Sequence, residues 1–459
     1  MSSLNASLAT ALSGLTADQD ALAATSNNVA NANTPGYSRE VPVLVTGNPI
    51  IEDPLTFGSG VSVQSIESIR DPILESQIAQ ETQTQGQLNS LVSALSETQV
   101  NFTSSSGDIG TDITNFFSSV NQLSTNPSDL SLRQGVLTAA DNLATAFNTT
   151  ANNLTSQVTS LNQNVTQTVG QINQLTTQIA QLNGQIANLE NVGESAGSFI
   201  DQRTQAIDQL SSLVDVSQIQ SGNNELTLTT AAGTALVAGQ QSFQLTTQPV
   251  ASGAEDIFSQ GTDITSTIAS GQLGGILEAR DQQIPAIQNQ LDTLAAGLAN
   301  SVNGVQTAGY DLNGNLGTDL FTPPPTSITG AAASLSVAIT DPSLIAASSD
   351  GTVGSNGNAD AMYALSSQNI VDGQTPNTYY SSIVFNVGNA VSNATASQTA
   401  SGLVLQQLND QNSAVSGVSL DEEAANMIQY QQAYAASAQV VTAINDMMYD
   451  VINMNTLTT

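Results

Sequence analysis

The chain has 459 residues, with 38 acidic side chains set against five arginines and a formal net charge of −33 at pH 7. It contains no lysine, histidine, cysteine or tryptophan. These absences exclude disulfides, thiolate zinc sites, histidine acid–base chemistry and lysine Schiff bases. Five scattered arginines in a strongly negative chain also make nucleic-acid binding by phosphate neutralisation untenable. Most soluble enzyme classes are thereby excluded, and we expect no catalytic residue, cofactor or metal.

The N-terminal residues do not resemble a secretory signal. Residues 1–20 contain no basic side chain, no long apolar core and no small-residue cleavage site. No stretch approaches the roughly 18–20 consecutive apolar residues of a membrane helix. We therefore expect no membrane insertion, and any export should use a route without a cleaved signal.

The chain begins with an expected amphipathic helix, whose apolar residues Leu8, Leu15, Leu22 and Val29 are spaced seven apart. That spacing places them along one helix face. The helix should end within residues 31–37, where proline and glycine break it. The residues of this expected linker are Asn27, Asn28, Asn31, Asn33, Pro35, Gly36 and Tyr37.

The most regular segment covers residues 154–189. One heptad position holds β-branched residues, namely Val158, Val165, Ile172, Ile179 and Ile186. The other holds leucine except at position 168, a pattern typical of coiled coils. A helix of this length would extend roughly 54 Å. A long intramolecular hairpin is favoured over a free dimerising coil.

Further elements follow by the same reasoning. Helical periodicity predicts helices over 88–102 and 284–305, while alternation near 216–248 predicts a β-hairpin or small sheet. Proline and glycine predict loops over 322–330 and 348–358, and residues 335–339 form a strand-like run.

A second amphipathic helix closes the chain, with Ser416 or Ser419 as its N-cap ahead of three acidic residues. Its apolar stripe includes Leu420, Met427, Tyr434, Val441 and Met448. The two terminal helices have apolar faces that nothing nearby in sequence covers. They should therefore pack on each other or on another molecule.

Three groups of charged residues have competing interpretations. Residues 421–423 could suggest paired carboxylates, but consecutive helical positions diverge, so a helix start is favoured. Residues 311–315 faintly resemble a calcium loop, yet lack its ligand spacing, so a turn is favoured. Arg203 with Asp201, and Arg280 with Asp281, are candidate ion pairs, which we expect to be ordinary surface pairs.

Both ends of the chain resemble the family of flagellar rod, hook and hook-associated axial proteins. Residues 13–22 and 26–39 are similar to the N-terminal signature of that family, and residues 416–441 are similar to its hook-associated members. Two interior blocks, 199–203 and 273–280, agree in the same order. The resemblance thus covers both ends and the middle.

This resemblance implies a mainly α, elongated fold. Residues 1–66 and 414–459 would form an inner-core domain of paired terminal helices with a linker. Residues 67–413 would form a helical, coiled-coil-like rod domain containing the small β-hairpin. Many relatives insert an outer β domain after the position of Phe321. Here only a short proline-rich loop near 322–335 follows, so we expect that domain to be absent or vestigial.

The resemblance also implies a structural, non-enzymatic subunit of the extracellular flagellum that joins hook to filament. Its partners would be further copies of itself in a ring-like layer, the hook protein, the second junction protein (hook-associated protein 3) and a flagellar export chaperone. The linker would touch neighbouring subunits, and the terminal stripes would serve as both core and interface. Alternatives are a hook or distal-rod protein, or a secreted coiled-coil adhesin or translocator.

Overall fold

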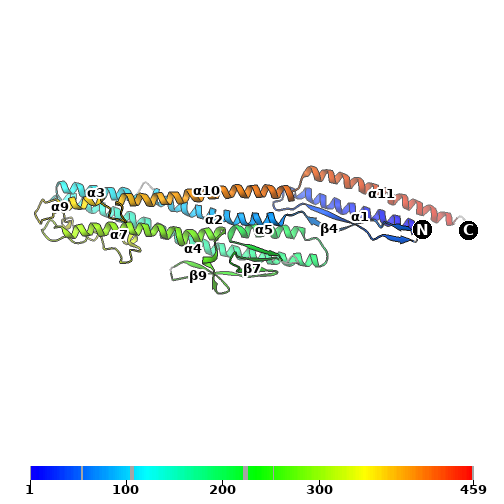
Figure 1. The fold of residues 1–459 in the computed structure, drawn as a ribbon, viewed down its shortest axis with the longest axis horizontal. Coiled ribbons are helices and arrows are strands. Elements are labelled where there is room, and N and C mark those ends of the chain that lie inside the picture. The colour runs from blue at the N-terminus through cyan, green and yellow to red at the C-terminus, as the bar shows by residue number, and fades with distance from the viewer. Residues whose placement is uncertain (1, 53–54, 104–107, 221–225, 252, 457–459) are drawn as a thin grey trace. The chain divides into compact units, whose positions relative to one another are not determined.

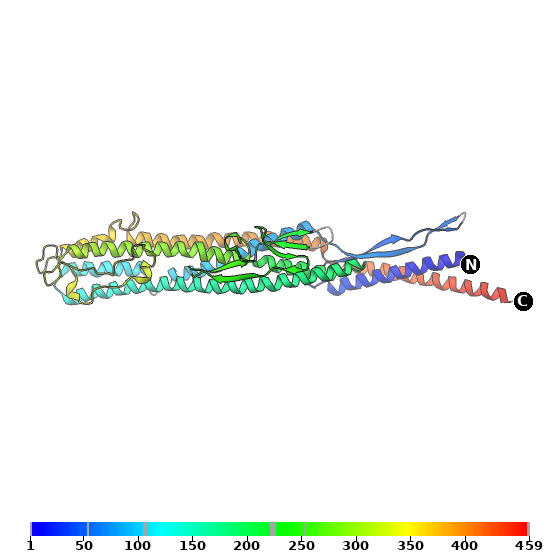
Figure 2. The same ribbon diagram turned by 90° about the horizontal axis from the view of Figure 1, so that it is seen from below.

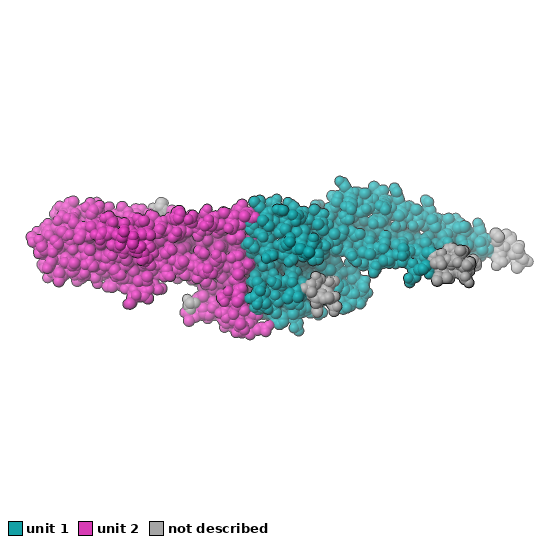
Figure 3. Space-filling model, in the orientation of Figure 1, with its two compact units in different colours: residues 1–84, 171–245, 401–459 teal, residues 85–170, 246–400 magenta. Residues whose placement is uncertain are grey.

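The computed structural model describes residues 2–52, 55–103, 108–220, 226–251 and 253–456. Its residues form two compact units, distinguished by colour in Figure 3. Unit 1 comprises 1–84, 171–245 and 401–459, and unit 2 comprises 85–170 and 246–400. Helices dominate both units, which confirms the predicted mainly α class. Three long helices contribute to both units: α2 (Pro72–Thr103), α4 (Leu130–Asn191) and α10 (Pro376–Ser416).

The two ends of the chain pair within unit 1. Helices α1 (Ser2–Asn31) and α11 (Leu420–Thr456) lie side by side (Figures 1 and 2). The end of α1 agrees with the predicted break. Ser419 caps α11, because its hydroxyl accepts the backbone N–H of Glu422 at 3.5 Å. Both predicted terminal helices are confirmed.

A long β-hairpin follows α1, and the sequence interpretation missed it. Its antiparallel strands are β1 (Glu40–Thr46), β2 (Ile50–Glu52), β3 (Leu55–Phe57) and β4 (Val61–Ser68). The hairpin packs on α1, where the backbone N–H of Val61 donates to Ser13 Oγ at 3.2 Å. Gly60 has a φ of +95°, and a Cβ there would collide with Ser13, so only glycine fits this close approach.

The remainder of unit 1 contains a small sheet packed on a helix. Helix α5 (Gly197–Leu213) precedes an antiparallel sheet of four strands: β5 (Ser217–Gln220), β6 (Leu226–Thr229), β7 (Ala235–Ala238) and β8 (Gln241–Ser242). Asn183 of α4 donates to the carbonyls of Leu226 and Gly239 at 3.1 and 2.8 Å, which fastens the sheet to the helix. The predicted small sheet is confirmed, and residues 221–225, within its predicted range, lie outside the described residues.

Unit 2 is a helical bundle with short peripheral elements. Its remaining helices are α3 (Ile109–Thr125), α6 (Gly271–Glu278), α7 (Ile284–Ala308), α8 (Ala331–Ser334) and α9 (Gly357–Ala364), with a π-helical turn η2 (Ala279–Gln283) before α7. Short 3-10 turns are η1 (Thr265–Thr267), η3 (Pro342–Leu344) and η4 (Leu365–Ser367), and a three-stranded sheet contains β9 (Leu245–Pro249), β10 (Glu255–Ser259) and β11 (Thr262–Asp263). Phe116 and Phe321 meet in the core with ring centroids 5.8 Å apart.

The predicted heptad helix is confirmed and proves longer than expected. Residues 154–189 lie inside the 62-residue helix α4, which extends about 93 Å at 1.5 Å per residue. Val165, Ile172, Ile179 and Ile186 are at most 1% exposed, so the stripe is buried within this single chain. Thr168, the break in the leucine series, is also buried. The intramolecular interpretation is therefore the one the structure adopts.

Two smaller expectations are corrected. The strand-like run at 335–339 forms only a single bridge, between Phe321 and Val337, because no neighbouring strand continues the ladder. The arginines expected at the surface are buried: Arg280 pairs with Asp281 at 2.7 Å with a side chain 1% exposed. Asp201 pairs with Arg70, while Arg203 donates to Asn183.

The expected turn at residues 311–315 is confirmed, since Asp311 accepts two backbone N–H groups there.

Candidate assembly site at the terminal helices and linker

The buried side chains of α1 are mainly small, where this helix packs on α11 and on the hairpin strands β1 and β4. Ala17, Ala21 and Ala24 of α1 are at most 3% exposed, and Ile444 of α11 is 4% exposed. Alanines allow two helix backbones to approach closely, but each removes little apolar surface from water. The pair is therefore close-packed and yet only weakly stabilised by its own burial.

The predicted apolar stripes are only partly buried within the described residues. Leu8, Leu15, Leu22, Met427, Val441 and Met448 are half-buried, whereas Val29, Leu420 and Tyr434 are 37%, 53% and 37% exposed. Val451 and Ile452, which continue the predicted C-terminal stripe, are also exposed. Further exposed apolar side chains that the stripe analysis missed are Leu12, Ile428, Val440, Met447 and Tyr449. Both helices thus present a large part of their apolar surface to the outside, a property of surfaces that other molecules cover.

The amide of Asn28 is the centre of a polar network where α1 ends. It is 1% exposed, and its Nδ2 donates to the Glu40 carbonyl at 2.8 Å and to Glu423 Oε2 at 3.1 Å. Its Oδ1 accepts the Tyr37 hydroxyl at 2.8 Å and the Glu40 N–H at 2.9 Å. Four hydrogen bonds use the full capacity of the amide. One side chain therefore ties together α1, the linker, the hairpin and α11.

Charged groups extend this network. Glu423 is 2% exposed, and Arg39 Nε lies 3.6 Å from its Oε1 while Arg39 Nη1 pairs with Glu422 at 2.7 Å. Burial raises the pKa of Tyr37 well above its usual value of 10, and the nearby Glu40, Asp201 and Glu423 act in the same direction. Tyr37 is therefore a neutral donor at physiological pH, which suits its bond to Asn28.

The linker is also anchored to α5. Arg70 pairs with Asp201 and donates to Thr204 Oγ1 at 3.2 Å, and Asp201 Oδ2 accepts the backbone N–H of Ser38 at 3.3 Å. A backbone bond of 2.9 Å from Arg39 N–H to the Ser416 carbonyl joins the linker to the segment before α11. Charge-assisted hydrogen bonds therefore connect the linker region to α5, and a backbone hydrogen bond connects it to the segment before α11.

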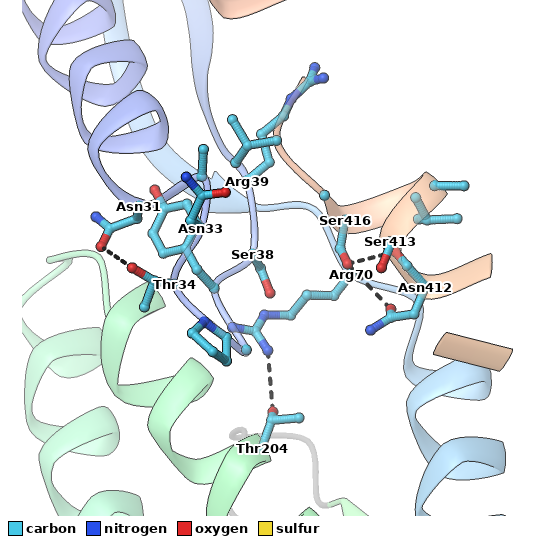
Figure 4. Close-up of a pocket in the computed structure, with 18 of the residues that line it drawn as sticks. Asn31, Asn33, Thr34, Ser38, Arg39, Arg70, Thr204, Asn412, Ser413 and Ser416 are labelled. Atoms are coloured by element: carbon cyan, nitrogen blue, oxygen red, sulfur yellow. Dashed lines mark hydrogen bonds between the residues drawn. The ribbon is translucent and has the colours of Figure 1, made fainter. Parts of the chain in front are cut away.

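A cleft of about 790 Å³ lies beside this linker. One wall is formed by residues 31–39 and the other by residues 412–419, with Arg70 and Thr204 between them (Figure 4). Of the predicted linker residues, Asn33, Pro35 and Gly36 are exposed, and Asn31 is half-buried in this wall. Asn27 is exposed and donates to Glu40 Oε2 at 3.0 Å. The structure therefore gathers Asn27, Asn28 and Tyr37 into the network, and leaves Asn33, Pro35 and Gly36 facing outward.

Sequence reasoning missed the partners of these residues. Arg39, Glu40, Arg70 and Glu423 were not predicted to belong to the site. The available signal was the scarcity of cations, since an arginine retained among only five is expected to have a definite acidic partner. Which acid it meets depends on tertiary structure.

The site offers binding surfaces rather than catalytic groups. No group of three metal-ligating side chains occurs among the described residues. Within the same residues, no helix has both the length and the apolar composition that crossing a membrane requires.

Three family models match the chain. Residues 95–321 match the helical domain of flagellar hook-associated protein FlgK, residues 8–37 match the flagella basal body rod protein family, and residues 411–454 match the C-terminal family of flagellar basal body rod FlgEFG proteins. The second and third matches contain the linker and most of α11, respectively.

Full-length relatives agree with these matches. The chain is 32% identical to flagellar hook-associated protein 1 of Bacillus subtilis (strain 168), over 99% of both chains. It is 27% identical to flagellar hook-associated protein 1 of Escherichia coli (strain K12), over 97% of this chain and 98% of the relative. The flagellar hook junction protein FlgK from Burkholderia pseudomallei shares the fold with a TM-score of 0.68 and 20% identity, over 74% of this chain and 100% of that one.

Proposed function

This chain belongs to the flagellar hook-associated protein 1 family, and we propose that it forms the structural layer joining hook to filament. The observation that carries the proposal is its 32% identity to the Bacillus subtilis member over 99% of both chains. Members of this family are structural parts of the flagellum rather than enzymes. The chain would accordingly act outside the cell, by contact alone.

The paired terminal helices support self-assembly. Their exposed apolar side chains, such as Leu12 at 54% and Tyr449 at 68%, have no cover within the described residues. Packing identical copies side by side would bury these faces and give a closed, ring-like layer. In this arrangement the predicted stripes serve as core and interface together.

The exposed part of the linker would contact neighbouring subunits. Asn33, Pro35 and Gly36 lie outward while Asn28 and Tyr37 hold the linker in one conformation. A rigid linker presents the same surface in every copy, which repetitive assembly requires. The hook protein, hook-associated protein 3 and an export chaperone are the further partners that we propose.

We also propose that the inner-core and rod domains are residues 1–66 with 414–459 and residues 67–413, and that the outer β domain is absent. The alignment to the Escherichia coli relative is 540 positions long, whereas this chain has 459 residues. That relative therefore holds residues without a counterpart here. The anchored loop at 322–335 is the place where we expect them to be missing.

A deletion strain, viewed by negative-stain electron microscopy with flagellin assayed in the medium, tests the proposal. Hooks without filaments, together with shed flagellin, are expected, and the wild-type gene should restore filaments. Absent hooks would move the assignment to a rod or hook protein. Normal filaments would contradict a flagellar role and favour a secreted adhesin or translocator.

A further inference from the structure

Every cationic side chain of this protein is engaged within its own chain. Arg39 and Arg70 are ion-paired, and Arg280 pairs with Asp281. Arg133 is 2% exposed and donates to the carbonyls of Pro127 and Ile345. Arg203 is 7% exposed and donates to Asn183 at 3.0 Å. Because lysine and histidine are absent from the sequence, the surface offers no free cationic side chain.

Because all five arginines are already engaged, the contacts that two copies of the chain can make are restricted. A salt bridge between two copies would require one of them to break an ion pair or hydrogen bond that already holds its fold. Breaking a buried pair leaves a charge without compensation, which is strongly unfavourable. Contacts between the described side chains of two copies are therefore expected to be apolar or uncharged, and a cationic side chain that pairs with an acid without disturbing a fold is expected to come from a different protein.

One acidic side chain in the linker cleft lacks a cation. Asp208 of α5 lines the cleft and makes no hydrogen bond or ion pair with any described residue. Burial raises its pKa to about 7, and the charge of Glu75 contributes in the same direction. Arg70, which also lines the cleft, is committed to Asp201 and Thr204. Asp208 is therefore partly shielded from water, has no cationic partner, and is only partly ionised at neutral pH.

The cleft as a whole has more acid than base. Its lining includes Glu75, Asp208 and Glu422 against two arginines, Arg39 and Arg70. Both arginines are shared with acids outside the lining, Asp201 and Glu423. With a volume of about 790 Å³ and walls of linker and inter-helix backbone, the cleft has room for a side chain and its flanking residues. Its charge and size are complementary to a cationic segment.

We propose that this cleft is the docking site for a lysine-bearing segment of a different protein in the assembly, with the lysine ammonium paired to Asp208. The proposal rests on the junction function, in which neighbours of other sequences meet this chain. Lysine fits better than arginine, because a flexible stem with a compact charge can reach a single recessed carboxylate, whereas guanidinium favours a two-pronged partner. A second copy of this chain is a poor occupant, because it has no lysine and its arginines are already engaged within its own fold.

Zero-length carbodiimide cross-linking of detached hook–filament structures tests this directly. The reagent joins a carboxylate to an amine in contact with it, and this chain has no lysine. A link from Asp208 to a lysine peptide, identified by mass spectrometry, must therefore involve another protein, and we expect that link. A link from Asp208 to the α-amine of Met1 would show a second copy in the cleft and overturn the proposal. Links from other acids with none from Asp208 would also overturn it.

A substitution at Asp208 tests the same docking site in living cells. Asp208→Asn should increase flagellin shedding several-fold in the complemented deletion strain, while the exposed Asp141→Asn should match wild type. The purified Asp208→Asn protein should be at least as stable as wild type at neutral pH, because a poorly solvated charge has been removed, so misfolding cannot account for shedding. Wild-type filament retention in Asp208→Asn would contradict the docking site alone. Normal filaments in the deletion strain would contradict the junction function itself.

Discussion

The α1–α11 pair and the helical bundle of unit 2 use the same kinds of residue in opposite ways. In the bundle the large apolar side chains Phe116, Phe147 and Phe321 are fully buried. In the pair, alanines are buried while Leu12, Ile428 and Tyr449 are more than half exposed. The bundle core is closed within one chain, whereas the pair leaves large apolar side chains that the described residues do not cover.

The energetic difference between these regions is large. Burying a phenylalanine contributes about 1.5–3 kcal/mol, and a methyl group only about 0.8 kcal/mol. The pair is therefore expected to depend more on the Asn28 network than on its own apolar contact.

The largest effect is expected in the bundle core. Phe116→Ala should lower the free energy of unfolding by about 3–5 kcal/mol, because it creates a cavity beside Phe321. Chemical denaturation followed by circular dichroism measures this. Phe385→Ala is the matched control, since that ring is 67% exposed, and it should cost less than about 0.5 kcal/mol. Equal losses in both variants would refute a closed bundle core.

The next largest loss of stability is expected at Asn28, the centre of the polar network where α1 ends. Asn28→Ala should cost about 2–4 kcal/mol, because it removes four hydrogen bonds and leaves Glu423 and Tyr37 buried with fewer partners. Hydrogen exchange should become faster in the first turns of α11. The exposed Asn33→Ala provides the control and should leave exchange unchanged. Unaltered protection in Asn28→Ala would mean that the network does not hold the two helices.

A smaller effect concerns pH. The folded-state pKa of Asp208 is about 7, above its usual value of 3.8, so the folded state binds this proton more tightly than the unfolded state does. The extra folding stability that comes from this tighter proton binding is fully present below about pH 4 and is lost as the pH rises through 7. This pH-dependent loss of stability, on the order of 1–3 kcal/mol between pH 4 and pH 8, should be absent in Asp208→Asn. Denaturant titrations at several pH values measure it; identical pH profiles for both proteins would contradict the prediction.

The smallest effect on the isolated chain is expected at the exposed faces of the pair. Leu12→Ser with Tyr449→Ser should change the free energy of unfolding by less than about 0.5 kcal/mol. Filament attachment should nevertheless fail, which electron microscopy of complemented cells would show. Val353→Ser, equally apolar and 69% exposed in unit 2, serves as the control. Intact attachment in the double variant would remove these faces from the assembly interface.

Periodicity predicted the long elements well, because a repeated apolar spacing permits only one buried helix face. It thus located α1, α4, α7 and α11, and Pro35 and Gly36 indicated that α1 ends shortly before them, at Asn31. It missed the hairpin of β1 and β4, although Val41, Val43 and Val45 alternate there, because the run is short and contains a proline. It did not indicate that Ala17, Ala21 and Ala24 of α1 are buried, since alanine carries almost no hydrophobic signal.

The linker shows the same division between local and non-local information. Asn27 to Tyr37 was recognisable from turn-forming residues, but Glu423 lies 395 positions from Asn28 along the chain. No local pattern connects such residues.

The sequence by itself determined the helical class, the buried heptad stripe of α4, the absence of a free lysine or histidine, and the family. Those properties depend on composition and on spacing along one segment. The fold was needed to show that Asn28 joins four segments, that each arginine is engaged inside the chain, and that Asp208 lines the cleft without a cationic partner of its own. The reason is physical: hydrogen bonds and ion pairs form between neighbours in space, and the fold alone brings residues 28, 39, 201 and 423 to their partners.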